Sequence, residues 1–136
     1  MNVLIVDDST AMRSIILKTL NISGLEIDTV YQAKNGQEAL DVLEENWVDL
    51  ALVDINMPVM DGETLINHIR QDPHLADLPI IVISTESSET RIVQLREKDV
   101  EFIHKPFAPE ELRATVFQIT GVENGTSTVS SGDYDF

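Results

Sequence analysis

Short apolar segments alternate with amphipathic segments along most of the chain. The apolar segments are rich in valine and isoleucine, which is typical of β-strands. They predict five strands, at Val3–Val6, Ile27–Ala33, Asp49–Val53, Leu78–Ser84 and Glu101–His104. The segments between them place apolar residues three or four positions apart, as one face of a helix requires. A helix is therefore expected after each strand, five in all.

The first, third and fourth predicted strands are apolar almost throughout. Strands of this kind are buried on both faces, which is typical of a parallel sheet with helices on both sides. Because strand–helix–strand crossovers are right-handed, five such units form an open, doubly wound α/β fold. The number of strands and the length of the chain favour the flavodoxin-like strand order 2-1-3-4-5.

Composition restricts the partners that the chain can have. Its 136 residues include 24 Asp and Glu but only 9 Lys and Arg, for a formal net charge of −15. Such a surface repels the phosphates of nucleic acids and phospholipids. No apolar run approaches the roughly 20 residues that span a bilayer, and the first residues lack a basic secretory leader. We expect no nucleic-acid partner, no membrane insertion and a cytoplasmic location. The absence of cysteine excludes disulfides and thiolate metal sites.

The composition changes after Gly121, where Gly, Ser, Thr, Asn and acidic residues leave little to bury. We therefore expect one folded domain over residues 1–120 and a disordered, acidic and polar tail over residues 121–136. The tail is too short to hold a DNA-binding or catalytic output domain. A signal would thus leave through the surface of the folded domain itself.

Polar and charged residues end four of the five predicted strands. The first strand ends at Asp7 and Asp8, the third at Asp54, the fourth at Ser84 and the fifth at Lys105. Ligands of an open parallel sheet bind outside the carboxyl ends of its strands, near the point where the strand order reverses. Three carboxylates, a hydroxyl and an ammonium group are thus expected at one edge of the sheet.

These groups suggest magnesium-dependent phosphoryl transfer to an aspartate. Three neighbouring carboxylates repel one another, and a hard divalent cation such as Mg²⁺, which prefers oxygen ligands, relieves that repulsion. Lys105 offers a compact positive charge for a phosphoryl group, and a carboxylate can be the nucleophile that forms an aspartyl-phosphate. Asp54 is the central candidate, because the third strand should lie between the first and the fourth.

Four separated motifs resemble those of the receiver domain of two-component response regulators, most closely the single-domain, chemotaxis-type receivers. They are Val6-Asp7-Asp8-Ser9, Asp54-Ile55-Asn56-Met57-Pro58-Val59-Met60-Asp61-Gly62, Ser84-Thr85-Glu86 and Lys105-Pro106-Phe107. The resemblance covers about residues 1–120, and the order and spacing of the motifs make it specific. It implies a signalling protein that accepts a phosphoryl group, with weak autophosphorylation and autodephosphorylation activity, and not a metabolic enzyme.

The resemblance also implies a role for each matching residue of the site. Asp54 would accept the phosphoryl group from a histidine kinase. Asp8 would bind Mg²⁺ directly and Asp7 largely through water, while Asp54 and the backbone carbonyl of Asn56 would complete the protein ligands. Lys105 would neutralise the charge of the phosphoryl group.

Other matching residues would transmit or limit the signal. Pro106 would follow Lys105 through a cis peptide bond. Ser84 would swing toward a phosphoryl oxygen, and Phe102 would turn inward behind it as the switch residue. The side chains of Asn56 and Glu86 would tune the lifetime of the phosphorylated state.

The face formed by the fourth helix, fifth strand and fifth helix would contact a protein partner, and a monomer or weak dimer is expected. Four of the nine basic residues lie on or beside those two helices: Arg91, Arg96, Lys98 and Arg113. They could form a partner surface or simply a solvated, charge-balanced helical face. The partner would be a flagellar motor switch protein, in chemotaxis or motility, or a histidine phosphotransfer protein.

Three alternatives remain at this stage. In a multistep phosphorelay the chain would pass its phosphoryl group to a histidine phosphotransfer protein. A Mg²⁺-dependent aspartyl phosphohydrolase of the haloacid dehalogenase type would want an acid two residues after the nucleophile, where this chain has Asn56. A pseudo-receiver would bind partners without phosphorylation, which the complete acid set and Lys105 disfavour.

Two further expectations concern the scaffold. Family members often have a glycine between the fourth helix and fifth strand, where this chain has Glu97-Lys98-Asp99. Either the helix ends differently, or Lys98 or Asp99 adopts a strained backbone. Trp47 is expected to be a packing residue beyond the second helix.

Overall fold

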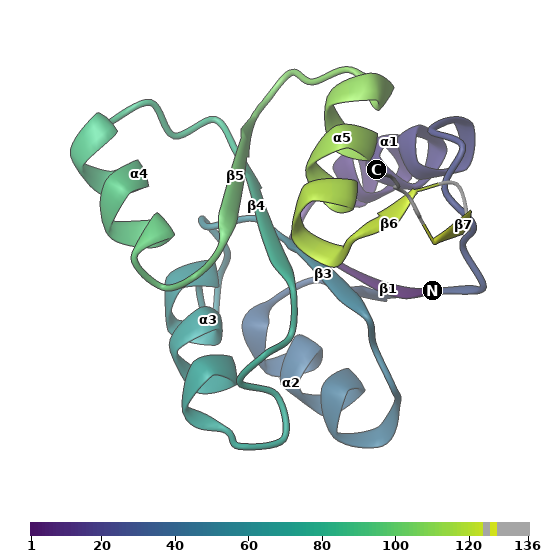
Figure 1. The fold of residues 1–136 in the computed structure, drawn as a ribbon. Coiled ribbons are helices and arrows are strands. Elements are labelled where there is room, and N and C mark those ends of the chain that lie inside the picture. Colours follow the sequence, from purple (N-terminus) through teal and green to yellow (C-terminus); the bar gives the residue numbers. More distant parts are fainter. Residues whose placement is uncertain (124–125, 128–136) are drawn as a thin grey trace.

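The computed structural model describes residues 1–123 and 126–127. Its centre is a five-stranded parallel sheet in the order β2-β1-β3-β4-β5, which confirms the predicted α/β fold and strand order (Figure 1). The strands are β1 (Asn2–Val6), β2 (Thr29–Ala33), β3 (Leu50–Val53), β4 (Ile80–Ser84) and β5 (Glu101–His104). β1 begins one residue earlier than predicted, whereas β2, β3 and β4 begin one or two residues later.

One helix follows each strand of this sheet. The helices are α1 (Thr10–Ile22), α2 (Gly36–Glu45), α3 (Gly62–Gln71), α4 (Glu89–Arg96) and α5 (Pro109–Thr120). Four begin at a side chain that accepts a hydrogen bond from a backbone N–H of the first turn: Ser9, Asn35, Asp61 and Ser88. Such caps satisfy N–H groups that the helix itself leaves unpaired. α5 instead begins at Pro109 and ends at Gly121, whose φ of 76° is left-handed.

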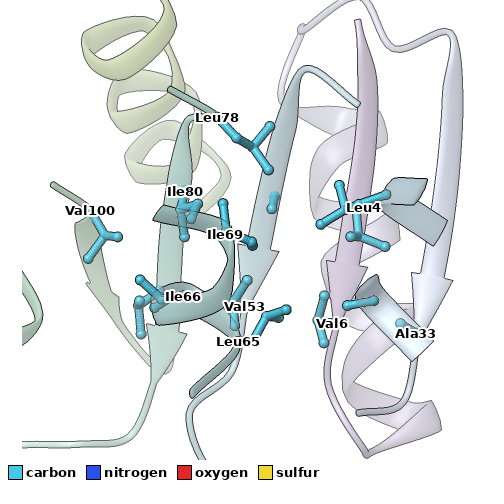
Figure 2. Close-up of a cluster of buried hydrophobic side chains, with 14 of the residues drawn as sticks. Leu4, Val6, Ala33, Val53, Leu65, Ile66, Ile69, Leu78, Ile80 and Val100 are labelled. Atoms are coloured by element: carbon cyan, nitrogen blue, oxygen red, sulfur yellow. The ribbon is translucent and has the colours of Figure 1, made fainter. Parts of the chain in front are cut away.

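Two apolar layers enclose the sheet. α1 and α5 cover one face, and α2, α3 and α4 cover the other (Figure 1). Figure 2 shows Leu65, Ile66 and Ile69 of α3 packed over Val53 and Ile80 of the sheet. Because successive strand residues point to opposite faces, a strand between two layers must be apolar at every position.

The connection from α4 to β5 adopts the strained alternative. Asp99 has a φ of 62°, in the left-handed region that favours glycine. Arg70 of α3 holds this connection in place, since its guanidinium donates to the backbone carbonyls of Lys98 and Asp99 at 2.9 and 2.8 Å. The same side chain also donates to the carbonyls of Ala76 and Leu78, just before β4. One arginine thus joins α3 to two loops.

The prediction for Trp47 is wrong. Its side chain is 76% exposed and does not pack in the core. The indole N–H donates to Asp49 Oδ1 at 2.8 Å, and the Trp47 carbonyl accepts from Asn2 Nδ2 at 3.0 Å. The bond to Asp49 holds the ring, and the bond from Asn2 holds the backbone of the α2–β3 connection.

The structure describes part of the segment after Gly121. β6 (Val122–Glu123) and β7 (Thr126–Ser127) form a two-stranded antiparallel pair. The rest of the predicted disordered tail lies outside the described residues, so that prediction stays open. Among the helices described here, none has the length and apolar character needed to cross a bilayer.

Candidate functional site

The carboxyl ends of β1 and β3 bring three carboxylates together. Oxygens of Asp7, Asp8 and Asp54 lie within 4.8 Å of one another. The backbone N–H of Asp54 donates to the carbonyl of Val6 at 2.9 Å, which extends the β1–β3 pairing by one residue. Backbone hydrogen bonding therefore places Asp54 beside the Asp7–Asp8 pair.

Lys105 reaches this acidic cluster from the end of β5. Its Nζ lies 3.1 Å from Asp7 Oδ2 and 3.7 Å from Asp54 Oδ1. The Lys105 backbone N–H donates to the carbonyl of Ser84 at 2.9 Å, and the Lys105–Pro106 peptide bond is cis. The Lys105 side chain is 13% exposed, so its charge acts where water screens it little.

The cluster retains an excess of negative charge. Burial raises the pKa of Asp54 above its ordinary value, and the charges of Asp7 and Asp8 raise it further. Lys105 and a hydrogen bond from the Ile55 backbone N–H lower the pKa, but they do not reverse the shift. Three converging carboxylates with one ammonium group fit a hard divalent cation such as Mg²⁺, which oxygen ligands hold and which relieves their repulsion.

Arg13 is a residue of this region that sequence reasoning missed. Its Nη1 donates to the backbone carbonyl of Asp7 at 2.6 Å, and its Nε donates to Gln32 Oε1 at 3.0 Å. Asp7 is also held by the backbone N–H of Ser9, which donates to Asp7 Oδ1 at 2.9 Å. A basic residue in the second turn of a helix carries no local signal, because Gln32 is nineteen residues away.

Gly62 is the second residue that was missed. Its backbone N–H donates to the carbonyl of Ile55 at 2.8 Å. A Cβ at this position would collide with the backbone carbonyl oxygen of Asp54 and lie 2.9 Å from Ile55 Cα. Gly62 therefore lets α3 begin directly against the segment that carries Asp54. Its place at the end of the nine-residue motif was visible in the sequence, but its function was not.

The other predicted residues lie around the same edge of the sheet. Ser84 is fully buried, and its Oγ accepts from the backbone N–H of Glu86 at 3.0 Å. The Glu86 side chain accepts from the backbone N–H of Ser88. Asn56 is exposed, whereas Phe102 is partly buried against the apolar layer under α2, α3 and α4.

Comparison with known families assigns this arrangement. The profile described as "Response regulator receiver domain" matches residues 3–117, nearly all of the described chain. The chain belongs to the response regulator receiver domain family. Receiver domains are phosphoacceptor signalling modules, and membership implies a histidine kinase as a partner. The Asp7–Asp8–Asp54 triad is typical of the receiver metal site.

Several receiver proteins are similar to this chain over most of its length. The "Chemotaxis protein CheY homolog" of Campylobacter jejuni is 36% identical over 127 residues, covering 92% of this chain and 96% of that protein. "Chemotaxis protein CheY1" of Helicobacter pylori is 36% identical and covers 91% of this chain and 100% of that protein. The crystal structure of "Chemotaxis response regulator CheY4" of Vibrio cholerae is 32% identical, with a TM-score of 0.74, and covers 87% and 97% of the two chains.

Proposed function

We propose that this protein is a stand-alone response regulator that accepts a phosphoryl group on Asp54 from the phosphohistidine of a histidine kinase. The observation that carries the proposal is the cluster of Asp7, Asp8 and Asp54 with Lys105 Nζ 3.7 Å from Asp54 Oδ1. In the transfer, a carboxylate oxygen of Asp54 bonds to phosphorus while the phosphorus–nitrogen bond breaks. The imidazole leaves with that electron pair and the product is an aspartyl-phosphate.

The residues around Asp54 have separate tasks in this proposal. Lys105 neutralises charge that builds up on the phosphoryl oxygens. Asp7, Asp8, Asp54 and the carbonyl of Asn56 would hold Mg²⁺, whose positive charge, when bound, offsets the repulsion between the phosphoryl group and the carboxylates. Gly62 fixes the backbone of Asp54 through its close approach.

The output side of the proposal begins at Ser84. Its Oγ would exchange the Glu86 backbone N–H for a phosphoryl oxygen, to which the hydroxyl can donate. Phe102 would then move further into the apolar layer and change the face formed by α4, β5 and α5. Asn56 and Glu86 would tune the lifetime of the acyl phosphate, which the domain itself forms and hydrolyses slowly.

The pathway proposed is chemotaxis or motility, with a flagellar motor switch protein as the target. The names of the Campylobacter and Helicobacter relatives support it, and those relatives are covered almost completely by this chain. The acidic surface supports a protein target and disfavours a nucleic acid. The proposed protein is cytoplasmic and is a monomer or a weak dimer. A histidine phosphotransfer protein is the alternative target, because a similar segment also occurs within a kinase, "Sensor histidine kinase TmoS" of Ectopseudomonas mendocina, which is 35% identical over 122 residues.

The test is mass spectrometry of the intact protein after incubation with Mg²⁺ and acetyl phosphate. The mass should rise by one phosphoryl group, and Asp54→Asn should abolish the rise. Asp61→Asn is the matched control, because Asp61 belongs to the same motif but caps α3 through a hydrogen bond that asparagine can also accept. An unchanged rise in Asp54→Asn would show that Asp54 is not the acceptor.

A further inference from the structure

A groove lies at the end of the sheet opposite to Asp54. It has a volume of about 520 Å³ and is lined by the end of α2, residues 46–49 and the loop before β4. Its apolar lining includes Leu43, Trp47, Val48, Pro73, Leu75 and Pro79. We call this surface the distal groove. β3 separates it from the acidic cluster, since Asp49 precedes that strand and Asp54 follows it.

Trp47 forms a fixed aromatic wall of the distal groove. An indole that is 76% exposed would ordinarily sample several rotamers, but this one donates to Asp49 Oδ1 at 2.8 Å. Asp49 is itself held, because its Oδ2 accepts from the backbone N–H of Asn2 at 2.7 Å. The ring is therefore positioned before any ligand arrives, which lowers the entropy that binding must overcome.

The charges around the wall have one sign. Glu44, Glu45, Asp49 and Asp77 all line the distal groove, and the described lining residues include no lysine or arginine, with His74 as the remaining ionisable residue. Carboxylates around an aromatic face favour a cation. A planar guanidinium fits both groups, because it stacks on an indole and pairs with carboxylates through parallel hydrogen bonds. Phosphate-bearing partners would be repelled.

We propose that the distal groove binds a basic segment of a protein partner that carries an arginine next to an apolar residue. The guanidinium stacks on the exposed face of Trp47 and pairs with Glu44, Glu45 or Asp77. The neighbouring apolar side chain covers the floor formed by Leu43 and its neighbours. This site is separate from the phosphoryl-acceptor edge, so a partner bound here leaves the α4–β5–α5 face free.

The probe is an acetylated tetrapeptide amide that alternates arginine and leucine. Trp47 is the only tryptophan of the chain, so its fluorescence reports binding at this place directly. Amide chemical shifts should change at residues 46–49 and 74–78, and affinity should fall as salt screens the carboxylates. A peptide with citrulline in place of arginine keeps the shape without the charge and should bind about tenfold more weakly.

Variants separate the groove from the general charge of the protein. Trp47→Leu should lower the affinity for the peptide about tenfold, because it removes the aromatic face but keeps an apolar side chain. Chemical-shift titration measures this affinity. Glu44→Gln with Glu45→Gln should weaken it several-fold. Glu89→Gln with Glu97→Gln, at the start of α4 and just after its end, removes the same charge elsewhere and should change affinity little.

Three results would overturn the proposal. One is peptide binding without amide shifts at residues 46–49 and 74–78. Another is equal affinity for the citrulline peptide, which would make the groove an apolar site. The third is self-association in sedimentation that Trp47→Leu abolishes, which would make a second copy of this chain the occupant. All measurements can be repeated in Asp54→Asn, so failure here is distinguishable from failure of the proposed function.

Discussion

The Asp54 carboxylate is 12% exposed and shares its surroundings with two other acids and one lysine. Its pKa is raised in the folded state, chiefly by burial. The folded protein therefore binds this proton more tightly than the unfolded chain does. Between the ordinary value of 3.8 and the raised pKa, increasing pH reduces the free energy of unfolding; above that window the loss is complete.

Asp54→Asn should therefore be more stable than the wild-type protein near neutral pH in the presence of a chelator. The difference between the two should shrink as the pH falls through the raised pKa toward about 3.8. Urea unfolding over this range measures it. Asp41→Asn, at an exposed position of α2, reports the effect of the amide alone. A difference that grows toward low pH would contradict the raised pKa of Asp54.

Gly62 and Gly36 provide a matched pair of first-turn glycines. Gly62→Ala should cost about 2–3 kcal/mol of stability, because the new methyl group meets the backbone of Asp54 and Ile55. Gly36→Ala should cost less, because the nearest atoms that its methyl group meets are Cβ, Cγ and Sδ of Met60, a flexible side chain and not backbone. Chemical denaturation should give a much lower free energy of unfolding for Gly62→Ala than for Gly36→Ala. The rate of Asp54 phosphorylation should also be lower in Gly62→Ala than in Gly36→Ala. Equal losses would mean that the backbone near Asp54 yields easily.

At the scale of elements, Arg70 connects α3 with the loop before β4 and the loop before β5. It donates four hydrogen bonds to backbone carbonyls, two of them in the connection that contains the left-handed Asp99. Arg70→Met should reduce the free energy of unfolding by about 3 kcal/mol, because these carbonyls lose a charged donor. Arg96→Met, on the exposed surface of α4, should change it by about 0.5 kcal/mol or less. A small effect of Arg70→Met would mean that water replaces the guanidinium without cost.

The basic residues near α4 are only partly available to a partner. Arg91 and Lys98 lie 3.1 and 3.9 Å from the carboxylate oxygens of Glu63 in α3, whereas Arg96 is exposed. Arg96→Glu should therefore lower the affinity for an acidic partner of the α4–β5–α5 face about fivefold or more, and it should not disturb α3. Binding to the beryllofluoride-loaded protein measures this, with Lys18→Glu on α1 as the control. Equal binding by both variants would leave this surface as a solvated face.

Elements that follow from local pattern were predictable, and those set by distant partners were not. β1, β3 and β4 have apolar runs, and parallel pairing forces their carboxyl ends to one edge, so the acidic cluster and Lys105 could be placed from the sequence. The missing glycine before β5 likewise indicated the strain found at Asp99. Trp47 was misplaced because its indole bonds to Asp49, whose carboxylate is in turn held by the backbone N–H of Asn2, 47 residues away.

At the scale of the whole molecule, cations act on the net charge of −15 by screening and on the acidic cluster by binding. Any salt screens the repulsion among surface charges and should raise the melting temperature modestly. Mg²⁺ should raise it further than NaCl at equal ionic strength, because the Asp7–Asp8–Asp54 cluster is a folded-state site. At a Mg²⁺ concentration ten times its dissociation constant, this extra stabilisation is about 1.4 kcal/mol.

Variants assign that extra stabilisation to the cluster. Asp8→Asn removes one exposed carboxylate of the cluster and should abolish most of the Mg²⁺-specific increase while leaving the NaCl response intact. Asp61→Asn removes the same charge outside the cluster, so both responses should remain. If Mg²⁺ and NaCl gave equal melting temperatures at matched ionic strength, the carboxylates would be acting only as part of the general negative surface. A specific increase confined to proteins with an intact cluster distinguishes a built cation site from a merely acidic protein.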